Sequence, residues 1–206
     1  MESSHAVESG GRFVREWAFA LAMRLFTAID LPESILYQMA RLLDALRPHA
    51  DLRWSRVENM HITTKFIGEW PEERLAELEA ALRGLASRAP IPIALRGLGW
   101  FPNPHSPRVF WVAVHAPPEL ARLARDTDAA LDRLGLRPEG RDFRPHLTLA
   151  RIEQAAQLGP LRRAIAAMPE VDLGSFEGSR FYLYSSQLGR GGSKYTRLAE
   201  FPFAQP

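Results

Sequence analysis

Two kinds of hydrophobic pattern alternate along the chain, and together they predict a mixture of strands and helices. Short runs of apolar and β-branched residues predict strands, whereas longer stretches with apolar residues every three or four positions predict amphipathic helices. We expect strands near residues 24–30, 60–67, 91–100, 108–115, 145–151, 171–177, 180–186 and 195–201. We expect helices near residues 33–47, 71–87, 118–134 and 155–168.

The order of these elements repeats once. The strand-like run at Leu25 leads into Pro32-Glu33 and a helical pattern, and the run at Val109 leads into Pro118-Glu119 and a helical pattern. Each unit then reaches a second strand and a further helix rich in Ala and Leu. Because the units are too long and too few for a solenoid, we expect two lobes related by a pseudo-twofold axis.

A short motif occurs at the same place in each unit. His61-Ile62-Thr63 and His146-Leu147-Thr148 both lie in apolar runs, and none of the other four histidines is followed by a threonine two residues later. Residues i and i+2 of a strand share a face, so each motif places an imidazole beside a hydroxyl. Pseudo-twofold symmetry would bring the two pairs together at the lobe interface. One histidine could then take a proton from water while the other protonates a leaving oxygen. The alternative is that both histidines are structural residues on half-buried strands.

Composition narrows the chemistry further. The chain has 206 residues and no cysteine, which excludes disulfides, thiolate catalysis and cysteine-based zinc sites. The net charge is only +2 although the pI is about 9.3, so contacts with a polyanion should be local. No run approaches the length of a membrane span, and we expect a cytoplasmic protein without membrane contact.

Three segments fall outside the repeat. Residues 1–22 fit neither unit, and we expect them to be an extension, non-native or disordered, before one bilobal domain at 23–206. Glu16 interrupts the basic residues there, and the apolar core is too short for a secretion signal. The turn-rich segment from Phe101 to Pro107 is expected to join the lobes, and Gly189 to Ser193 is expected to be a hairpin loop.

The chain resembles the 2H phosphoesterase superfamily, and more narrowly the RNA 2′,3′-cyclic phosphodiesterases, also called 2′-5′ RNA ligases. The two His-x-Thr motifs (HxTx) carry the resemblance, which covers about residues 23–203. The other matching segments are Arg24 to Pro32, Asn59 to Gly68, Phe143 to Arg151, Tyr184 to Ser186 and Gly192 to Tyr195. The resemblance implies an α+β fold of two antiparallel sheets flanked by helices, with one motif per lobe lining a central cleft.

The resemblance also implies an activity. RNA ends bearing a 2′,3′-cyclic phosphate, on oligonucleotides or tRNA-like fragments, would be hydrolysed to 2′-phosphates by a monomer without metal or cofactor. Reverse 2′-5′ ligation is a further activity of the family. His61 would be the general acid and His146 the general base, and the hydroxyls of Thr63 and Thr148 would bind the phosphate.

Several further residues are expected near the substrate. Arg151 should add positive charge beside the phosphate or stack on a base. Strand alternation places Lys65 on the face of His61 and Thr63, where it could steer phosphate. The candidate nucleotide contacts are Phe26, Lys65, Arg144, Lys194 and Tyr195.

Three other functions stay open at this point. A metallophosphoesterase would need a third ligand, and neither motif carries a carboxylate. A noncatalytic RNA-binding module would bind RNA without turnover. The same chemistry could also act on a small cyclic nucleotide, because the catalytic core contacts only the phosphate.

Overall fold

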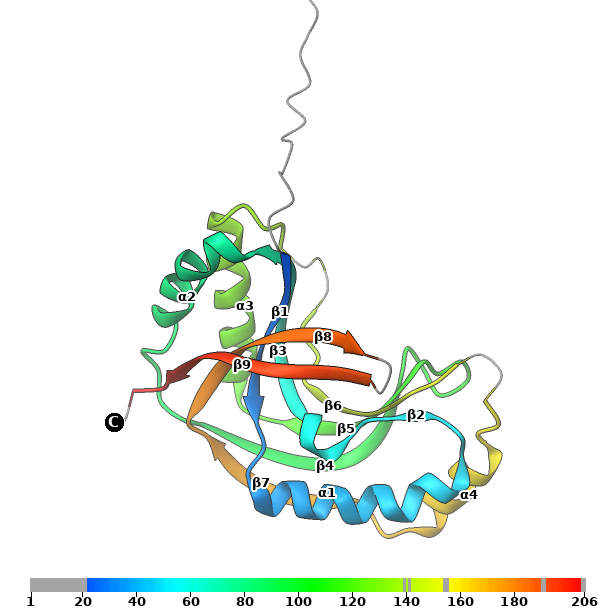
Figure 1. Cartoon of the computed structure of the whole chain (residues 1–206). Coiled ribbons are helices and arrows are strands. Elements are labelled where there is room, and N and C mark those ends of the chain that lie inside the picture. Colours follow the sequence, from blue (N-terminus) through cyan, green and yellow to red (C-terminus); the bar gives the residue numbers. More distant parts are fainter. Residues whose placement is uncertain (1–21, 139, 141, 154–155, 190–191, 205–206) are drawn as a thin grey trace, which may run out of the picture.

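Two antiparallel sheets form the centre of the computed structural model, which describes residues 22–138, 140, 142–153, 156–189 and 192–204 (Figure 1). The strand orders are β3-β1-β8-β9 and β2-β6-β5-β4-β7. The four-stranded sheet contains β1 (Ala22–Asp30), β3 (His61–Pro71), β8 (Arg180–Gly189) and β9 (Gly192–Pro202). The five-stranded sheet contains β2 (Arg53–Trp54), β4 (Ile91–Phe101), β5 (Val109–His115), β6 (His146–Arg151) and β7 (Asp172–Gly178).

Helices α1 and α3 exchange lobes. The α-helices in the described part of the chain are α1 (Glu33–Leu46), α2 (Leu75–Arg83), α3 (Pro118–Arg133) and α4 (Gly159–Ala167). Helix α1 follows β1 of the four-stranded sheet but packs on β7 of the other sheet, next to α4. Helix α3 follows β5 of the five-stranded sheet but packs on β3, next to α2 (Figure 1). Each sheet is therefore covered by one helix from each half of the chain.

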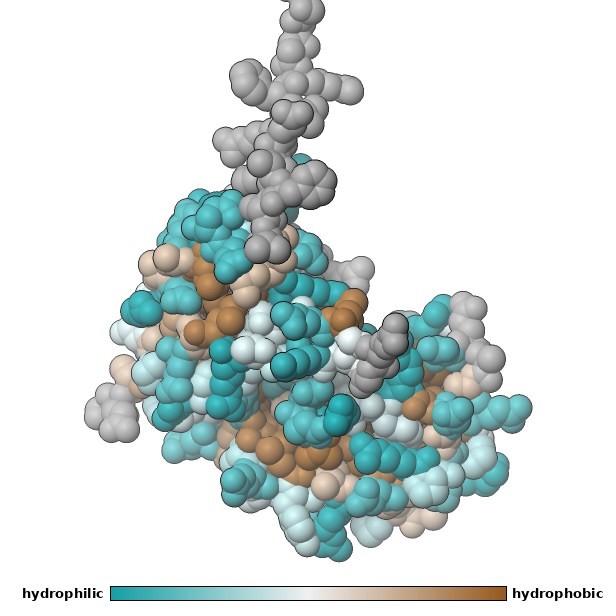
Figure 2. Space-filling view, in the orientation of Figure 1, coloured by the Kyte–Doolittle hydropathy of each residue, from teal (hydrophilic) through white to brown (hydrophobic). Residues whose placement is uncertain are grey.

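One apolar cluster connects the two lobes. It joins the helix-facing side of both sheets, with Leu25 and Ile62 in one sheet and Leu95 and Phe110 in the other. A smaller cluster of Phe26, Ala28, Tyr182 and Tyr184 lies on the other face of the four-stranded sheet. The outer surface seen in Figure 2 is mainly hydrophilic, with apolar residues gathered above α1. Among the described residues, no helix has the length and apolar character needed to cross a membrane.

The sequence-based expectations hold for the main elements. The predicted α+β fold with two antiparallel sheets is confirmed, and each predicted strand and helix overlaps an observed one. Within the described residues, the short 3₁₀ helices η1 (Arg47–His49) and η2 (Val57–Asn59) were not predicted, whereas η3 (Glu72–Arg74) forms the start of the helix expected near residues 71–87. The two-residue strand β2 was not predicted either.

The predicted role of the loop after Phe101 is wrong. Phe101 pairs with Val109, so this loop closes a hairpin between β4 and β5 of the same sheet and does not join the lobes. The hairpin expected at the end of the chain is present, since Gly189 pairs with Gly192 across β8 and β9. Residues 1–21 and 190–191 lie outside the described residues.

Candidate active site

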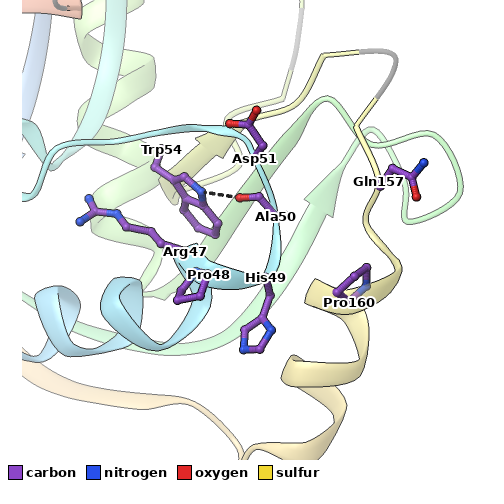
Figure 3. A pocket seen from close by; sticks show the side chains of 8 residues that line it. All are labelled: Arg47, Pro48, His49, Ala50, Asp51, Trp54, Gln157 and Pro160. Atoms are coloured by element: carbon purple, nitrogen blue, oxygen red, sulfur yellow. Dashed lines mark hydrogen bonds between the residues drawn. The ribbon is translucent and has the colours of Figure 1, made fainter.

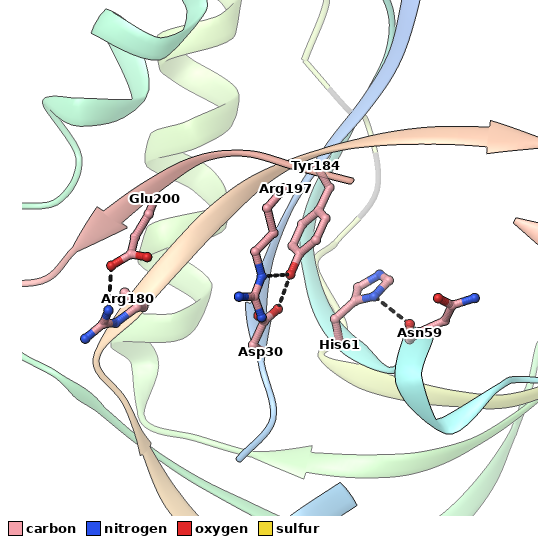
Figure 4. Close-up of polar contacts among 7 residues, drawn as sticks. All are labelled: Asp30, Asn59, His61, Arg180, Tyr184, Arg197 and Glu200. Carbon is pink, nitrogen blue, oxygen red and sulfur yellow. Dashed lines mark hydrogen bonds and ion pairs between the residues drawn. The ribbon is translucent and has the colours of Figure 1, made fainter. Parts of the chain in front are cut away.

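The two histidines are held in the same way. Each begins its strand, His61 in β3 and His146 in β6, and each Nδ1 lies 2.8 Å from the carbonyl oxygen two residues earlier, that of Asn59 or Arg144. A carbonyl oxygen only accepts hydrogen bonds, so Nδ1 carries the proton and donates it. The second ring nitrogen, Nε2, is therefore the atom that exchanges a proton in both rings. Figure 4 shows this contact for His61.

The threonines follow on the same strand faces. Thr63 and Thr148 are half-buried like the histidines, whereas Ile62 and Leu147 between them are buried in the core. Strands β3 and β6 are in direct contact, so the strands that carry the two motifs lie side by side. Two imidazoles and two hydroxyls thus lie on neighbouring strands, with one pair from each sheet.

A β-bulge follows each motif at the same position. The pairing of β3 with β1 shifts between Thr63 and Lys65, and the pairing of β6 with β5 shifts between Thr148 and Ala150. A bulge inserts one extra residue and reverses the alternation of faces beyond it. The two sheets therefore share this local irregularity as well as the motif.

The bulge makes the alternation argument for Lys65 wrong. Lys65 is 6% exposed, and its Nζ lies 2.6 Å from a carboxylate oxygen of Asp128 on α3. It pairs with Thr27, whose hydroxyl is buried against that of Thr64 on the helix side of the sheet. Lys65 thus belongs to the helix side and not to the face of His61.

The same shift brings two other side chains onto the motif face. Arg151 is five residues after His146, and Phe66 is five residues after His61. Strict alternation would turn them away, but the bulge returns both to the side of the histidines. Phe66 is 55% exposed and Arg151 is exposed at the end of β6. The sequence prediction included Arg151 but missed Phe66, although an aromatic residue at this spacing was a signal that could be found.

Aromatic rings enclose His61. Its ring centroid lies 4.7 Å from that of Phe26 in a stacked arrangement and 5.2 Å from that of Tyr195, which approaches edge-on. Tyr184 lies against both rings, with its centroid 5.2 Å from that of Phe26 and 6.0 Å from that of His61. Tyr195 is half-buried beside the ring, whereas Phe26 is 3% exposed and lies beneath the site instead of facing a nucleotide. Burial lowers the pKa of His61 from 6.5 to about 4, although the Asn59 carbonyl and the charge of Asp30 act in the opposite direction.

This lowered pKa predicts a loss of stability in acid. Between pH 6.5 and pH 4 the unfolded state binds a proton at His61 that the folded state does not. The free energy of unfolding therefore decreases as the pH is lowered through this range. Replacing His61 by Gln should remove this component, roughly 2–3 kcal/mol at pH 4.5 relative to pH 7. Urea unfolding of both proteins at the two pH values measures it. The same pH dependence in His61→Gln and wild type would contradict the prediction.

A network of three polar side chains lies beside His61 and includes Tyr184 (Figure 4). The Tyr184 hydroxyl donates to Asp30 at 2.6 Å and accepts from Arg197 Nε at 2.8 Å, while Arg197 also pairs with Asp30 (Figure 4). Burial and the hydrogen bond to Asp30 raise the pKa of the Tyr184 hydroxyl. The network fixes the tyrosine that supports Phe26, and Phe26 in turn supports His61.

His146 has aromatic neighbours of its own. Phe101 approaches it edge-on at 5.0 Å between centroids, and Trp111 lies 4.9 Å from Phe101. The Trp111 ring occupies the space above Gly99, where an added Cβ would come within 2.2 Å of ring atoms. Gly99 therefore allows the tryptophan to lie flat against the strand next to Phe101.

Two hollows on the surface lie apart from the motif histidines. One of about 540 Å³ is lined by residues such as Arg47, His49 and Trp54, whose indole donates to the carbonyl oxygen of Ala50 (Figure 3). Another of about 290 Å³ lies beside Asp30 and Arg197. Neither of these two hollows is lined by a motif histidine. Within the described ranges, no group of three or more His, Cys, Asp or Glu side chains is arranged to hold a metal ion.

Two sheets that each present a histidine and a threonine from a bulged strand define a phosphoesterase of the two-histidine class. The family described as LigT like Phosphoesterase matches residues 29–111 and again residues 112–195, and the chain belongs to this family. The resemblance noted in the sequence is thereby confirmed.

Several curated relatives are named RNA 2′,3′-cyclic phosphodiesterase. The RNA 2′,3′-cyclic phosphodiesterase of Methanothermobacter thermautotrophicus is 34% identical over 183 residues, covering 88% of this chain and 99% of its own length. That of Aeropyrum pernix is 40% identical over 166 residues, with 79% and 93% covered.

Solved structures agree with this fold. A protein from Thermus thermophilus superposes with a TM-score of 0.76 at 32% identity, over 89% of this chain and 99% of that one. E. coli LigT complexed with 3′-AMP gives 0.74 at 29% identity, with the same coverage.

Proposed function

We propose that this chain hydrolyses the 2′,3′-cyclic phosphate at the end of an RNA and leaves a 2′-phosphate. The observation that carries the proposal is the matched pair of His-x-Thr strands, each with Nδ1 bound to a backbone carbonyl and Nε2 left for proton exchange. The names of the curated relatives support the choice of a cyclic phosphate on RNA as substrate.

The proposed reaction needs one base and one acid. His146 takes a proton from water through Nε2 as the water oxygen bonds to phosphorus, and the bond from phosphorus to O3′ breaks. His61 then delivers its Nε2 proton to O3′. His61 is uncharged at neutral pH in the free protein, and the anionic phosphate, placed against the ring, favours the protonated form that the acid requires. Ligation would use the same groups, with the 5′-hydroxyl of a second RNA in place of water.

The neighbouring side chains have supporting roles in this proposal. The hydroxyls of Thr63 and Thr148 donate to the non-bridging oxygens, whose negative charge increases in the transition state. Arg151 and Phe66, which the bulges bring to the motif face, contact the RNA beside the reacting phosphate, Arg151 by its charge and Phe66 by stacking. Tyr195 lies against His61, and Arg144 and Lys194 are exposed near their respective motifs.

The test is product analysis. The purified chain is incubated in EDTA with a short RNA that ends in a 2′,3′-cyclic phosphate, and the position of the phosphate in the product is determined. We expect a 2′-phosphate from wild type. Turnover only when a divalent metal is supplied would favour a metallophosphoesterase, and turnover only of small cyclic nucleotides would change the substrate. Binding of RNA without turnover of either would favour a noncatalytic binding module.

A further inference from the structure

Two arginines stand side by side at the edge of the five-stranded sheet, just beyond the second motif. Arg53 of β2 pairs in register with Arg151 of β6. We propose that these two side chains form a subsite for an internal phosphodiester of the RNA, one that precedes the cyclic end. This inference rests on the proposed function and adds that the chain prefers an RNA strand over a cyclic mononucleotide.

The pairing places both arginines on the face of the active site. Residues opposite each other on adjacent strands point to the same side of a sheet. On its other side, β6 pairs with β5, where Arg151 lies opposite Val109 and Thr148 lies opposite Trp111. Val109 and Trp111 are two residues apart and share a face, so Arg151 lies on the same face as Thr148. Trp54, the neighbour of Arg53, points the other way and packs against buried Phe110 with ring centroids 6.2 Å apart.

The charges at this edge are poorly balanced. Like charges directly opposite each other on adjacent strands repel, and an anion placed between them would relieve the repulsion. The ion pair of Arg53 is with Glu153, at 4.0 Å, with side chains 72% and 78% exposed. An ion pair so long and so exposed contributes little and exchanges readily for a phosphate. Arg151 makes no ion pair within the described parts of the chain.

The backbone that carries Arg53 is fixed in place. The amide of Ser55 donates to the carbonyl oxygen of Leu149 at 2.7 Å, and its hydroxyl donates to that of Thr148 at 2.8 Å. These bonds tie the strand of Arg53 directly to the motif strand. The backbone of Arg53 therefore has a defined position relative to Thr148, so the strand itself need not become ordered on binding.

The spacing directs the arginines to a different phosphate from the one that reacts. Thr148 lies opposite Trp111 and Arg151 lies opposite Val109, two residues further along β5, so the bulge leaves roughly 7 Å between the two positions along the sheet. Arg53 is about 5 Å to the side on the neighbouring strand. A phosphate held between the imidazoles and bound by Thr148 would be at one end of this row. The arginines at the other end would contact the RNA strand that leads to this phosphate.

Two substrates and two variants test the subsite. The substrates are a nucleoside 2′,3′-cyclic phosphate and a tetranucleotide that ends in the same nucleoside 2′,3′-cyclic phosphate. The variant is Arg53→Gln, and the matched control is Arg41→Gln, an exposed arginine on α1. We expect Arg53→Gln to lower kcat/KM for the tetranucleotide about tenfold, mainly through KM, the loss of one charge-assisted contact. Turnover of the mononucleotide should stay within twofold of wild type.

The salt dependence gives a second readout. For the tetranucleotide, the slope of log kcat/KM against log salt concentration should become shallower by about one in Arg53→Gln and stay unchanged in Arg41→Gln. Three results for Arg53→Gln would overturn the subsite: an equal fall in kcat/KM with both substrates, an unchanged kcat/KM for the tetranucleotide, or an unchanged salt slope. None of these results would contradict the proposed hydrolytic activity. Absence of turnover of either substrate by wild type would instead refute the proposed function.

Discussion

Replacing either His61 or His146 by alanine is expected to lower kcat by 10²- to 10⁴-fold, on the order of the loss for one general acid or base. Each substitution removes one Nε2 that the matched backbone contacts direct to proton exchange. The measurement is steady-state hydrolysis of an RNA 2′,3′-cyclic phosphate at neutral pH. His49→Ala is the matched control, because His49 lies in η1, in the hollow lined by Trp54 and away from both motifs.

The double variant separates concerted action from independent contributions. In the proposed mechanism both imidazoles act on one phosphate in one step, so His61→Ala/His146→Ala should be little worse than the worse single variant. Losses that multiply fully would show that the histidines do not work as a pair. A rate that stays near wild type in either single variant would exclude that histidine as acid or base.

The second large effect is expected at the threonines. Thr63→Val and Thr148→Val keep the size of the side chain and remove the hydroxyl, and each should lower kcat about 10²- to 10³-fold, as loss of one donor to a developing oxyanion does. Thr63→Ser and Thr148→Ser, which keep the hydroxyl, should retain most of the rate. If the serine variants lose as much as the valine variants, the threonines act through packing and not through hydrogen bonds.

The main strands and helices could be predicted because the residues that they bury recur with a regular period along the chain. The alternation of β5, with Phe110 and Val112 buried and Val109 and Trp111 half-buried, is visible in the residues themselves. Strand β2 was not visible, since two residues have no period and are held by pairing with β6. The exchange of α1 and α3 was not visible either, because an amphipathic pattern shows that a helix has an apolar face but not which sheet covers it.

The site residues that belong to one short stretch of sequence could be predicted. His61 and His146 are placed by strand geometry that the motif already implies. Lys65 was misplaced because a bulge adds a residue without changing the composition of the strand. The network of Asp30 with Tyr184 and Arg197 could not be found from spacing, since its members are separated by 154 and 167 positions in the chain.

The strand order also sets the order in which the lobes can be completed during synthesis. All strands of the five-stranded sheet have been made once residue 178 leaves the ribosome, so the lobe of His146 can close first. Strand β1 is made early, but it pairs with β8, which starts at Arg180. The lobe of His61 therefore waits for the last strands to be translated. A nascent chain that stops before Arg180 has both motifs but only one finished lobe.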